Sequence, residues 1–535
     1  MSFNPLSAMA TYPSYHEIVG NYYDKSNLIE EIRKCDVQNL LLVVAMLNNT
    51  TSINSSLIRD DFVEYLAYLY PKSPVRNVLS RSDVLFHPQG LLNTAKWLIA
   101  YGDFSKSEPI FSQNGNMYQY VRQVIKLCLI ISDFMDQRET DEVSFDQLQS
   151  DLLRNGNFNN KSDIASQTAR TLYLLDDLSV ISESSGFDYK SLFKSKYNYT
   201  IREYIALLFV IYSIYLTREK NMSAFNIDTF FGNTLLADRG RAFFNLLVCT
   251  PSDIKDWALS TLDSPWEFRG FWRKPLLQLP CGRIHPMLPS ILLSNLYIDL
   301  EIKICQLFVN SKRAEVKSQL GRQFEKYTCD LAAESFGNAR YVSQVFPEFP
   351  YGPNKSPDYM VLFEDKLIVI EAKSLRPLAD FAFQDDLEPI QNGVKKLIID
   401  PMNQTLERVG ELMSRDLWNG HPRPNISEVY IMVVTIVGIT SWEPNETFIH
   451  STLSIPSNVP LMGHFHVDIH EFELLCELAE RKHAKPLIHY LNRNNPQQVP
   501  FSQHLYKENL HPRRPNRLKK LYKEKSELIR RTIFY

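Results

Sequence analysis

Two carboxylates and a lysine lie close together between Pro357 and Lys373. Asp358 precedes one short apolar run, and Glu371 and Lys373 follow the next one. Adjacent carboxylates raise each other's pKa unless a cation joins them. Oxygen ligands suit Mg²⁺, which usually keeps several waters and also contacts substrate phosphate. These residue types therefore predict a cation site beside an ammonium group. Such a combination can hydrolyse a phosphodiester.

A β-hairpin is the element expected to position these side chains. Two β-rich apolar runs, residues 359–363 and 367–370, flank a candidate two-residue turn. In the register set by that turn, Asp358 falls opposite Glu371, with Cβ atoms about 4.5–5.5 Å apart. Side chains alternate along a strand, so Lys373 shares the face of Glu371. A loop one residue longer or shorter would move Asp358 to the wrong face.

These residues resemble the PD-(D/E)XK nuclease superfamily, because Pro357-Asp358 and Glu371-Ala372-Lys373 fill its pattern without a gap. The resemblance implies an α/β restriction-endonuclease-like domain with a central mixed sheet. It also implies Mg²⁺, for which Mn²⁺ can substitute, held by Asp358, Glu371 and the Ala372 carbonyl. Lys373 would place the attacking water, and the products would carry 5′-phosphate and 3′-hydroxyl ends. The alternative is that these are ordinary strand-end carboxylates beside a solvated lysine.

The segment before the hairpin fits the same pattern of elements. Residues 311–336 are expected to form a helix, because apolar residues recur at spacings of three to four. Superfamily members often carry a metal-assisting glutamate on this helix, so the resemblance makes Glu325 a third acidic candidate. The alternative is a solvated helix glutamate. Residues 341–346 would form the first strand.

After the hairpin, Asp-Pro-Met-Asn-Gln404 resembles the Asn-Pro-x-x-Gln element of nuclease-related domains, with Asp400 in place of the usual asparagine. Gln404 is then a candidate for orienting substrate or the catalytic lysine, and Gln391 is its rival. The amphipathic stretch at 405–413 and the continuous apolar run at 429–437 indicate a helix and a buried central strand.

The whole chain has 535 residues, which predicts two or three domains. We expect an α+β multidomain protein, with the nuclease-like domain at 311–495. The first 250 residues are expected to be mostly helical, with apolar faces or cores at 40–47, 58–70, 117–135 and 201–216. Residues 251–310 indicate a hairpin and a long connecting helix, and residues 496–535 a basic C-terminal tail.

Nucleic-acid binding has to come from local patches, because the net charge of the chain is −3. Residues 511–531 hold nine Lys or Arg against two Glu, a local charge of +7 that could contact several phosphates. A solvated basic tail is the alternative. The candidate nucleic-acid-binding residues are Arg513, Arg514, Arg517, Lys519 and Lys520.

Two further histidine patterns are open to other interpretations. His464, His466, Asp468 and His470 alternate with apolar residues, so a strand would place them on one face, as a metal site requires. The preferred interpretation is an edge strand with a polar exposed side, leading into a helix at 471–482. The segment 81–87 superficially resembles the Arg-x(4–6)-His motif of small helical ribonucleases, and we interpret it as a chance match.

The cysteines and the N-terminus indicate a cytoplasmic protein. The seven cysteines are scattered and form no CxxC pair, which argues against a disulfide scaffold or zinc ribbon. The start lacks a basic segment and a long apolar core, and the longest apolar stretch, at 204–216, is too short to span a membrane. We therefore expect no membrane association.

The predicted function is that of a Mg²⁺-dependent endonuclease acting on DNA, with restriction or anti-phage defence as its setting. One alternative is a nucleic-acid-sensing or partner-binding protein with an inactive nuclease fold. Another is a ribonuclease that uses the same site. The N-terminal helical region could mediate homo-oligomerisation or bind an accessory protein.

Overall fold

The computed structural model describes residues 14–16, 20–49, 87–105, 117–135, 164–177, 188–217, 231–232, 234–374, 392–436, 438, 443–481, 484–495, 499–511 and 513–534. Within these residues the chain is a mixture of helices and mixed sheets without a barrel, as the α+β expectation requires. Among them, no helix has both the length and the apolar character needed to cross a membrane. All seven cysteines are described, and none forms a disulfide.

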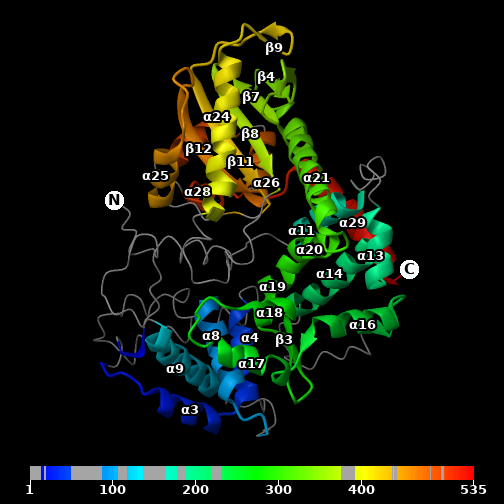
Figure 1. Cartoon of the computed structure of the whole chain (residues 1–535), viewed down its shortest axis with the longest axis vertical. Helices are drawn as coiled ribbons and strands as arrows, with labels where there is room; N and C mark the ends of the chain where they lie inside the picture. Colours follow the sequence, from blue (N-terminus) through cyan, green and yellow to red (C-terminus); the bar gives the residue numbers. More distant parts are fainter. Residues whose placement is uncertain are drawn as a thin grey trace.

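A five-stranded mixed sheet with the order β12-β11-β8-β7-β4 forms the upper part of the molecule in Figure 1. Strands β8, β11 and β12 are parallel, whereas β7 is antiparallel to both β8 and β4. The strands are β4 Gln344–Pro347, β7 Tyr359–Phe363, β8 Lys366–Lys373, β11 Glu428–Thr435 and β12 Leu461–Asp468. The mixed sheet expected from the sequence is therefore present, with β8 and β11 as its buried central strands.

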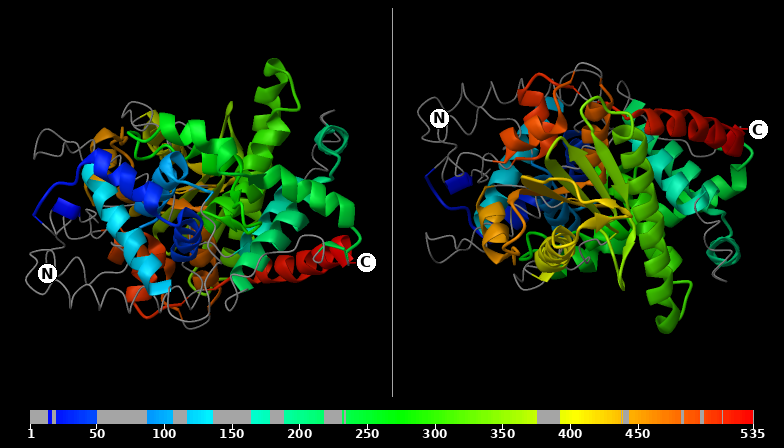
Figure 2. Two further views of the ribbon diagram at one scale, coloured as in Figure 1. Left: turned by 90° about the horizontal axis from the view of Figure 1, so that it is seen from below. Right: turned by 90° about the horizontal axis from the view of Figure 1, so that it is seen from above.

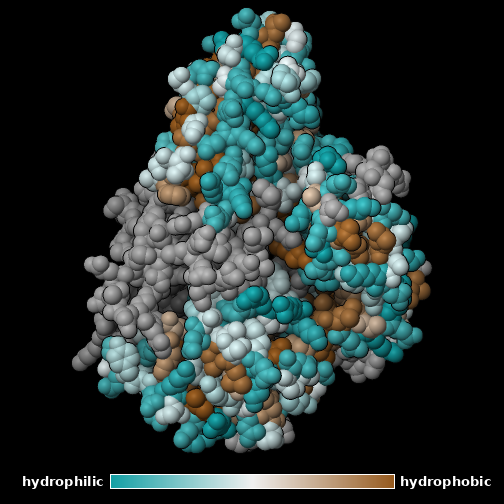
Figure 3. Space-filling view, viewed as in Figure 1, coloured by the Kyte–Doolittle hydropathy of each residue, from teal (hydrophilic) through white to brown (hydrophobic). Residues whose placement is uncertain are grey.

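Helices cover both faces of this sheet (Figure 2). On one face, α21 (Asn310–Phe336) and α26 (Ile469–Glu480) pack against alternate side chains of β7, β8 and β11. The other face packs against α24 (Asp400–Met413) and α25 (Glu443–Thr452). Apolar side chains of α24 point into the core, while its outer surface is hydrophilic (Figure 3). The helices expected near 311–336, 405–413 and 471–482 are confirmed, each with slightly shifted ends.

A second core lies in the lower part of Figure 1. It joins the described helices up to residue 135 to residues 249–291, so it crosses the boundary expected at 250. Three of the four helical stretches expected in the first 250 residues are confirmed, and the fourth, at 58–70, lies outside the described residues. Among the described residues up to 250, the helices are α3 Lys25–Lys34, α4 Val37–Asn48, α8 Pro88–Tyr101, α9 Met117–Met135, α11 Ile164–Leu172, a π-helical turn Tyr173–Asp177, α13 Tyr189–Tyr197, α14 Ile201–Thr217 and α16 Ala237–Leu247.

Residues 251–310 contain the expected hairpin and connecting helix. Strands β2 and β3 pair antiparallel, and β1 adds to β2 in parallel. The connecting helix is split by a π-helical segment into α19 and α20. The elements are β1 Val248–Cys249, a 3₁₀ turn Ser252–Ile254, α17 Lys255–Ser260, α18 Arg269–Arg273, β2 Leu276–Gln278, β3 Ile284–Pro286, α19 Pro289–Ser294, the π-helical segment Asn295–Asp299 and α20 Leu300–Cys305.

The C-terminal residues are folded into the core rather than forming a tail. Helix α29 (Asn516–Phe534) buries Leu518, Leu521, Ile529 and Ile533 in the same core as α11 and α14. These four residues recur at helical spacing, so one face of the basic segment is apolar. The remaining short elements are β5 Pro350–Tyr351, β6 Asn354–Lys355, a π-helical turn Lys395–Ile399, β9 Leu417–Trp418, β10 His421–Pro422, α27 Leu487–Asn494 and α28 Phe501–Lys507.

Candidate functional site

The hairpin of β7 and β8 has the predicted register. Phe363 pairs with Lys366 and Tyr359 with Ile370, which places Asp358 opposite Glu371 just beyond the last pair. The turn contains Glu364 at a left-handed φ of 58°. The favoured two-residue hairpin turns require a positive φ at their first central residue. The prediction that Asp358 and Glu371 meet at one end of the hairpin is confirmed.

The side chains at this end lie on the sheet face that α24 covers. Alternate residues Leu367 and Val369 of β8 belong to the core beneath α24, whereas Ile368 and Ile370 face α21. By the same alternation Glu371 and Lys373 point toward the α24 side, and Ala372 points to the α21 side, where its side chain is buried.

Asp358 is buried and strongly perturbed. Its Oδ2 accepts a hydrogen bond of 2.7 Å from the backbone N–H of Ala372, and the residue is 6% exposed. Burial, followed by the negative charge of Glu371, raises the pKa of Asp358 to about 8. Burial disfavours the charged form, and an adjacent carboxylate adds repulsion. The site is therefore short of positive charge where Asp358 and Glu371 meet.

Glu371 has one satisfied and one unsatisfied oxygen. Its Oε1 accepts hydrogen bonds from Lys373 Nζ at 2.7 Å and from Arg408 Nη1 at 3.2 Å. Its Oε2 is buried and makes no hydrogen bond to the residues that the structure describes. The residue is 1% exposed. A buried carboxylate oxygen without a partner is costly, so this atom is suited to a ligand with positive charge.

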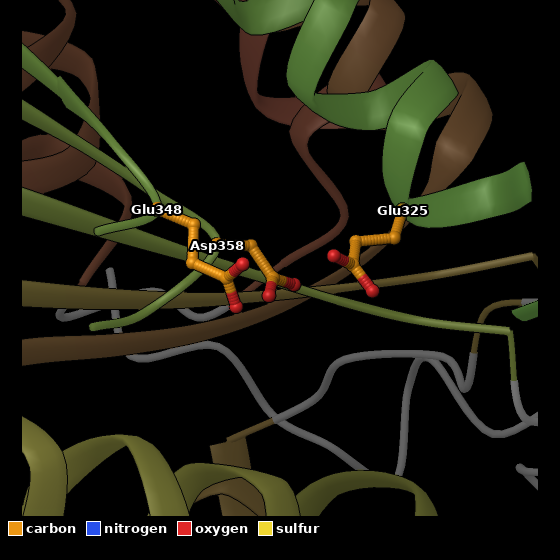
Figure 4. A group of neighbouring side chains, drawn as sticks. All are labelled: Glu325, Glu348 and Asp358. Atoms are coloured by element: carbon orange, nitrogen blue, oxygen red, sulfur yellow. The ribbon is translucent and has the colours of Figure 1, made fainter. Parts of the chain in front are cut away.

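Three acidic side chains converge on one point beside the hairpin (Figure 4). Glu325 of α21, Glu348 after β4 and Asp358 each offer a carboxylate oxygen within 4.8 Å of the others. Burial and then the charges of Glu348 and Glu371 raise the pKa of Glu325. Glu348 also binds Lys355 Nζ at 2.8 Å, and its backbone N–H donates to the Asp358 carbonyl. Figure 4 shows the carboxylates pointing toward one another from separate elements.

Two residues of this site are absent from the sequence-based prediction. Glu348 lies in an irregular segment with no motif of its own, so only the fold reveals it. Arg408 lies one helical turn after the predicted Gln404, and an i, i+4 search along α24 would have found it. Gln404 itself is exposed on α24, and its rival Gln391 lies outside the described residues.

The predicted nucleic-acid-binding residues divide into two groups. Arg514 donates to Ser166 and stacks on Tyr522, and Arg517 binds Asp330 at 3.0 Å. These two contacts attach the segment to α11 and α21. The members of the predicted set that are exposed to solvent are Arg513, Lys519 and Lys520, of which Lys520 also binds Glu334 at 3.2 Å.

The expected polar, exposed side of the strand at 464–468 is wrong. β12 is an edge strand, but His464 and His466 are 3% and 4% exposed because α25 covers them. His470 belongs to helix α26 and does not share the strand face. In the ribonuclease-like segment, His87 is the N-cap of α8 and accepts from the Gln89 N–H at 3.1 Å, while Arg81 lies outside the described residues.

Comparison with protein-family models, with curated proteins and with solved structures found no match. The site provides three converging carboxylates, with Glu371 beside Asp358, and one lysine and one arginine on Glu371, at the end of a mixed sheet. Hard oxygen donors of this kind suit Mg²⁺ or Mn²⁺ rather than a soft metal.

Proposed function

We propose that this chain is a metal-dependent endonuclease of the PD-(D/E)XK type, with DNA as its substrate. The observation that carries the proposal is the buried, unpartnered Oε2 of Glu371 beside Asp358, whose pKa is raised. The order of elements supports it. Helix α21, strands β4, β7 and β8, helix α24 and strand β11 follow one another as a restriction-endonuclease-like core requires.

The acidic residues fit a hard divalent ion. Asp358 and Glu371 would hold Mg²⁺ together with the Ala372 carbonyl, and Glu325 and Glu348 would contribute from the neighbouring elements. When bound, Mg²⁺ supplies a water of lowered pKa and stabilises negative charge on the phosphate. Burial and then the neighbouring carboxylates raise the pKa values of Asp358 and Glu325, as expected where acidic side chains are gathered to bind a cation.

Lys373 and Arg408 supply positive charge to the proposed site. The Lys373 side chain is 25% exposed and the Arg408 side chain 31% exposed, so both can contact a phosphate at the sheet end while they remain paired with Glu371. Lys373 orients the attacking water, and Arg408 stabilises charge that develops on the phosphate oxygens. Gln404, exposed on the same helix as Arg408, supports the orientation of the substrate.

DNA is proposed because it is the usual substrate of the superfamily that these residues resemble. Arg513, Lys519 and Lys520 are the members of the basic set that are available for phosphate contacts. The large helical region attached to the sheet domain is consistent with sensing in restriction or anti-phage defence. The ribonuclease alternative uses the same catalytic residues, and the sensor alternative needs none of them.

A substrate panel distinguishes these functions. The purified chain would be incubated with supercoiled plasmid, linear duplex DNA, single-stranded DNA and structured RNA, in Mg²⁺ and in EDTA. Mg²⁺-dependent nicking by wild type, lost in Glu371→Ala and Lys373→Ala, supports the proposal. Cleavage of RNA alone assigns the ribonuclease, and no cleavage of any substrate favours the sensor. Equal cleavage by all three proteins refutes the site.

A further inference from the structure

The small hairpin formed by β5 and β6 lies in the chain between two of the converging acidic residues. Glu348 precedes β5, and Asp358 follows β6. The two strands pair antiparallel, and Gly352 in the turn between them has a left-handed φ of 62°. The hairpin therefore begins and ends beside the acidic cluster, so a group that it carries lies next to the proposed metal site.

One face of α24 connects this hairpin to the end of β8. Arg408, Glu411 and Arg415 recur three and four residues apart, so they lie along one side of the helix and of the turn that follows it. Arg408 Nη1 contacts Glu371 Oε1 at 3.2 Å. Glu411 Oε2 accepts a hydrogen bond of 3.0 Å from Asn354 Nδ2 in the hairpin. This face therefore runs from the acidic residue on β8 to the hairpin.

Arg415 rests on the hairpin itself. Its guanidinium carbon lies 4.9 Å from the centre of the Tyr351 ring. The guanidinium also lies against the turn, because a Cβ atom at Gly352 would be 3.4 Å from Arg415 Nη2. A guanidinium supported by an aromatic ring is oriented before a ligand arrives, so it loses less side-chain freedom when it binds.

The other cations beside the acidic cluster are already paired. Lys373 and Arg408 bind Glu371, and Lys355 of the hairpin binds a second carboxylate at 2.8 Å. Arg415 is exposed, and its guanidinium forms no ion pair with a carboxylate in the described part of the chain. A phosphate can accept two parallel hydrogen bonds from such a guanidinium.

We propose that Arg415 binds a phosphate of the DNA strand that is cut, an inference that rests on the proposed nuclease function. Arg408 and Arg415 are seven residues apart, which corresponds to about 10 Å along a helix. One strand of a duplex advances about 3.4 Å per nucleotide, so the phosphate at Arg415 lies about three nucleotides from the one at Arg408. A phosphate contact fixes the register of the strand and does not read its sequence.

Binding of DNA in the absence of cleavage tests this role. The full-length Lys373→Met protein would be the common background, and the anisotropy of a fluorescently labelled duplex would be measured in Mg²⁺ at several salt concentrations. Adding Arg415→Gln should raise the dissociation constant about tenfold and reduce the slope of log K against log salt by about one. Arg415→Lys keeps the charge and should restore the slope.

Arg340 provides a matched control. It lies over the ring of Tyr341 at 5.4 Å and is also exposed, but it precedes β4, whose other end leads to Glu348. Arg340→Gln should therefore bind DNA as its background does. In the chain that retains Lys373, Arg415→Gln should raise the DNA concentration for half-maximal single-turnover cleavage about tenfold, with a much smaller change in the rate at saturation.

Several results would overturn the proposal even if wild type cuts DNA. They are an unchanged affinity and salt slope in Arg415→Gln, an equal loss of affinity in Arg340→Gln, or a slope that Arg415→Lys does not restore. Absence of duplex binding by the background protein would overturn it as well. Binding without any cleavage by wild type would contradict the nuclease function, and the salt slopes of the Arg415 variants would still decide whether Arg415 holds a phosphate.

Discussion

Replacing Asp358 with asparagine should stabilise the metal-free protein at neutral and alkaline pH. The substitution removes one of two buried, mutually repelling carboxylates. Asparagine keeps a carbonyl oxygen that can accept the hydrogen bond from the Ala372 N–H, so local geometry should persist. A residue placed for metal binding is thus expected to lower the stability of the fold that carries it.

The magnitude follows from the pKa of Asp358, which is about 8 in the folded protein. In the unfolded chain the pKa of an aspartate is about 3.9. A carboxyl group whose pKa is raised by folding contributes stability that is complete below about pH 4 and is lost as the pH rises to about 8. At about 1.4 kcal/mol per pKa unit, wild type loses on the order of 5 kcal/mol across this window, and Asp358→Asn loses none of it.

Denaturant unfolding in EDTA at about pH 5, 7 and 8.5 measures this difference. The advantage of Asp358→Asn over wild type should grow with pH, while the exposed control Asp416→Asn should follow wild type. Mg²⁺ should then raise the stability of wild type at the highest pH and have much less effect on Asp358→Asn. If Asp358→Asn is equally stable or less stable than wild type at every pH, the Asp358 carboxylate does not destabilise the metal-free fold.

Three further predictions concern other contacts of the molecule. Glu348→Gln should raise the Mg²⁺ concentration for half-maximal cleavage about tenfold, because it removes one negative charge from the metal site. Arg408→Gln should lower the single-turnover cleavage rate about 10²-fold with little change in Mg²⁺ dependence, as loss of a charge-stabilising donor does. Arg170→Met should lower the free energy of unfolding by about 3–5 kcal/mol, since it leaves the buried Glu473 carboxylate without its charged partner. The exposed ion-pair control Arg530→Ala should cost less than about 1 kcal/mol in the same denaturant titration.

Each of these has a result that would contradict it. An unchanged Mg²⁺ requirement in Glu348→Gln would remove that residue from the metal site. A cleavage rate for Arg408→Gln equal to that of wild type would leave its contact with Glu371 a purely structural one. Equal unfolding free energies for Arg170→Met and Arg530→Ala would show that the buried pair adds nothing to stability.

The hairpin and its face could be predicted because they depend on local rules. A two-residue turn fixes which residues are opposed, and strand parity then puts Asp358, Glu371 and Lys373 on one side. The helices around it were equally accessible, since α21 and α24 have apolar residues at helical spacing.

The contacts made by packing could not be predicted in the same way. Arg408 reaches Glu371 only because α24 crosses the end of β8, and Glu348 reaches Asp358 from a segment without regular structure. His464 and His466 are buried because α25 covers an edge strand, which no local pattern indicates. Arg517 likewise finds Asp330 on α21, far away in the sequence.

We infer that the sheet-end cluster cuts phosphodiesters with the help of Lys373. Two lysines at opposite ends of β8 provide the most direct test, because Lys373 contacts Glu371 and Lys366 contacts Glu428. Single-turnover nicking of supercoiled plasmid in Mg²⁺ would be compared for wild type, Lys373→Met and Lys366→Met. We expect nicking to be lost in Lys373→Met and retained in Lys366→Met. Equal rates for the two variants, or no nicking by wild type, would rule out this role of Lys373.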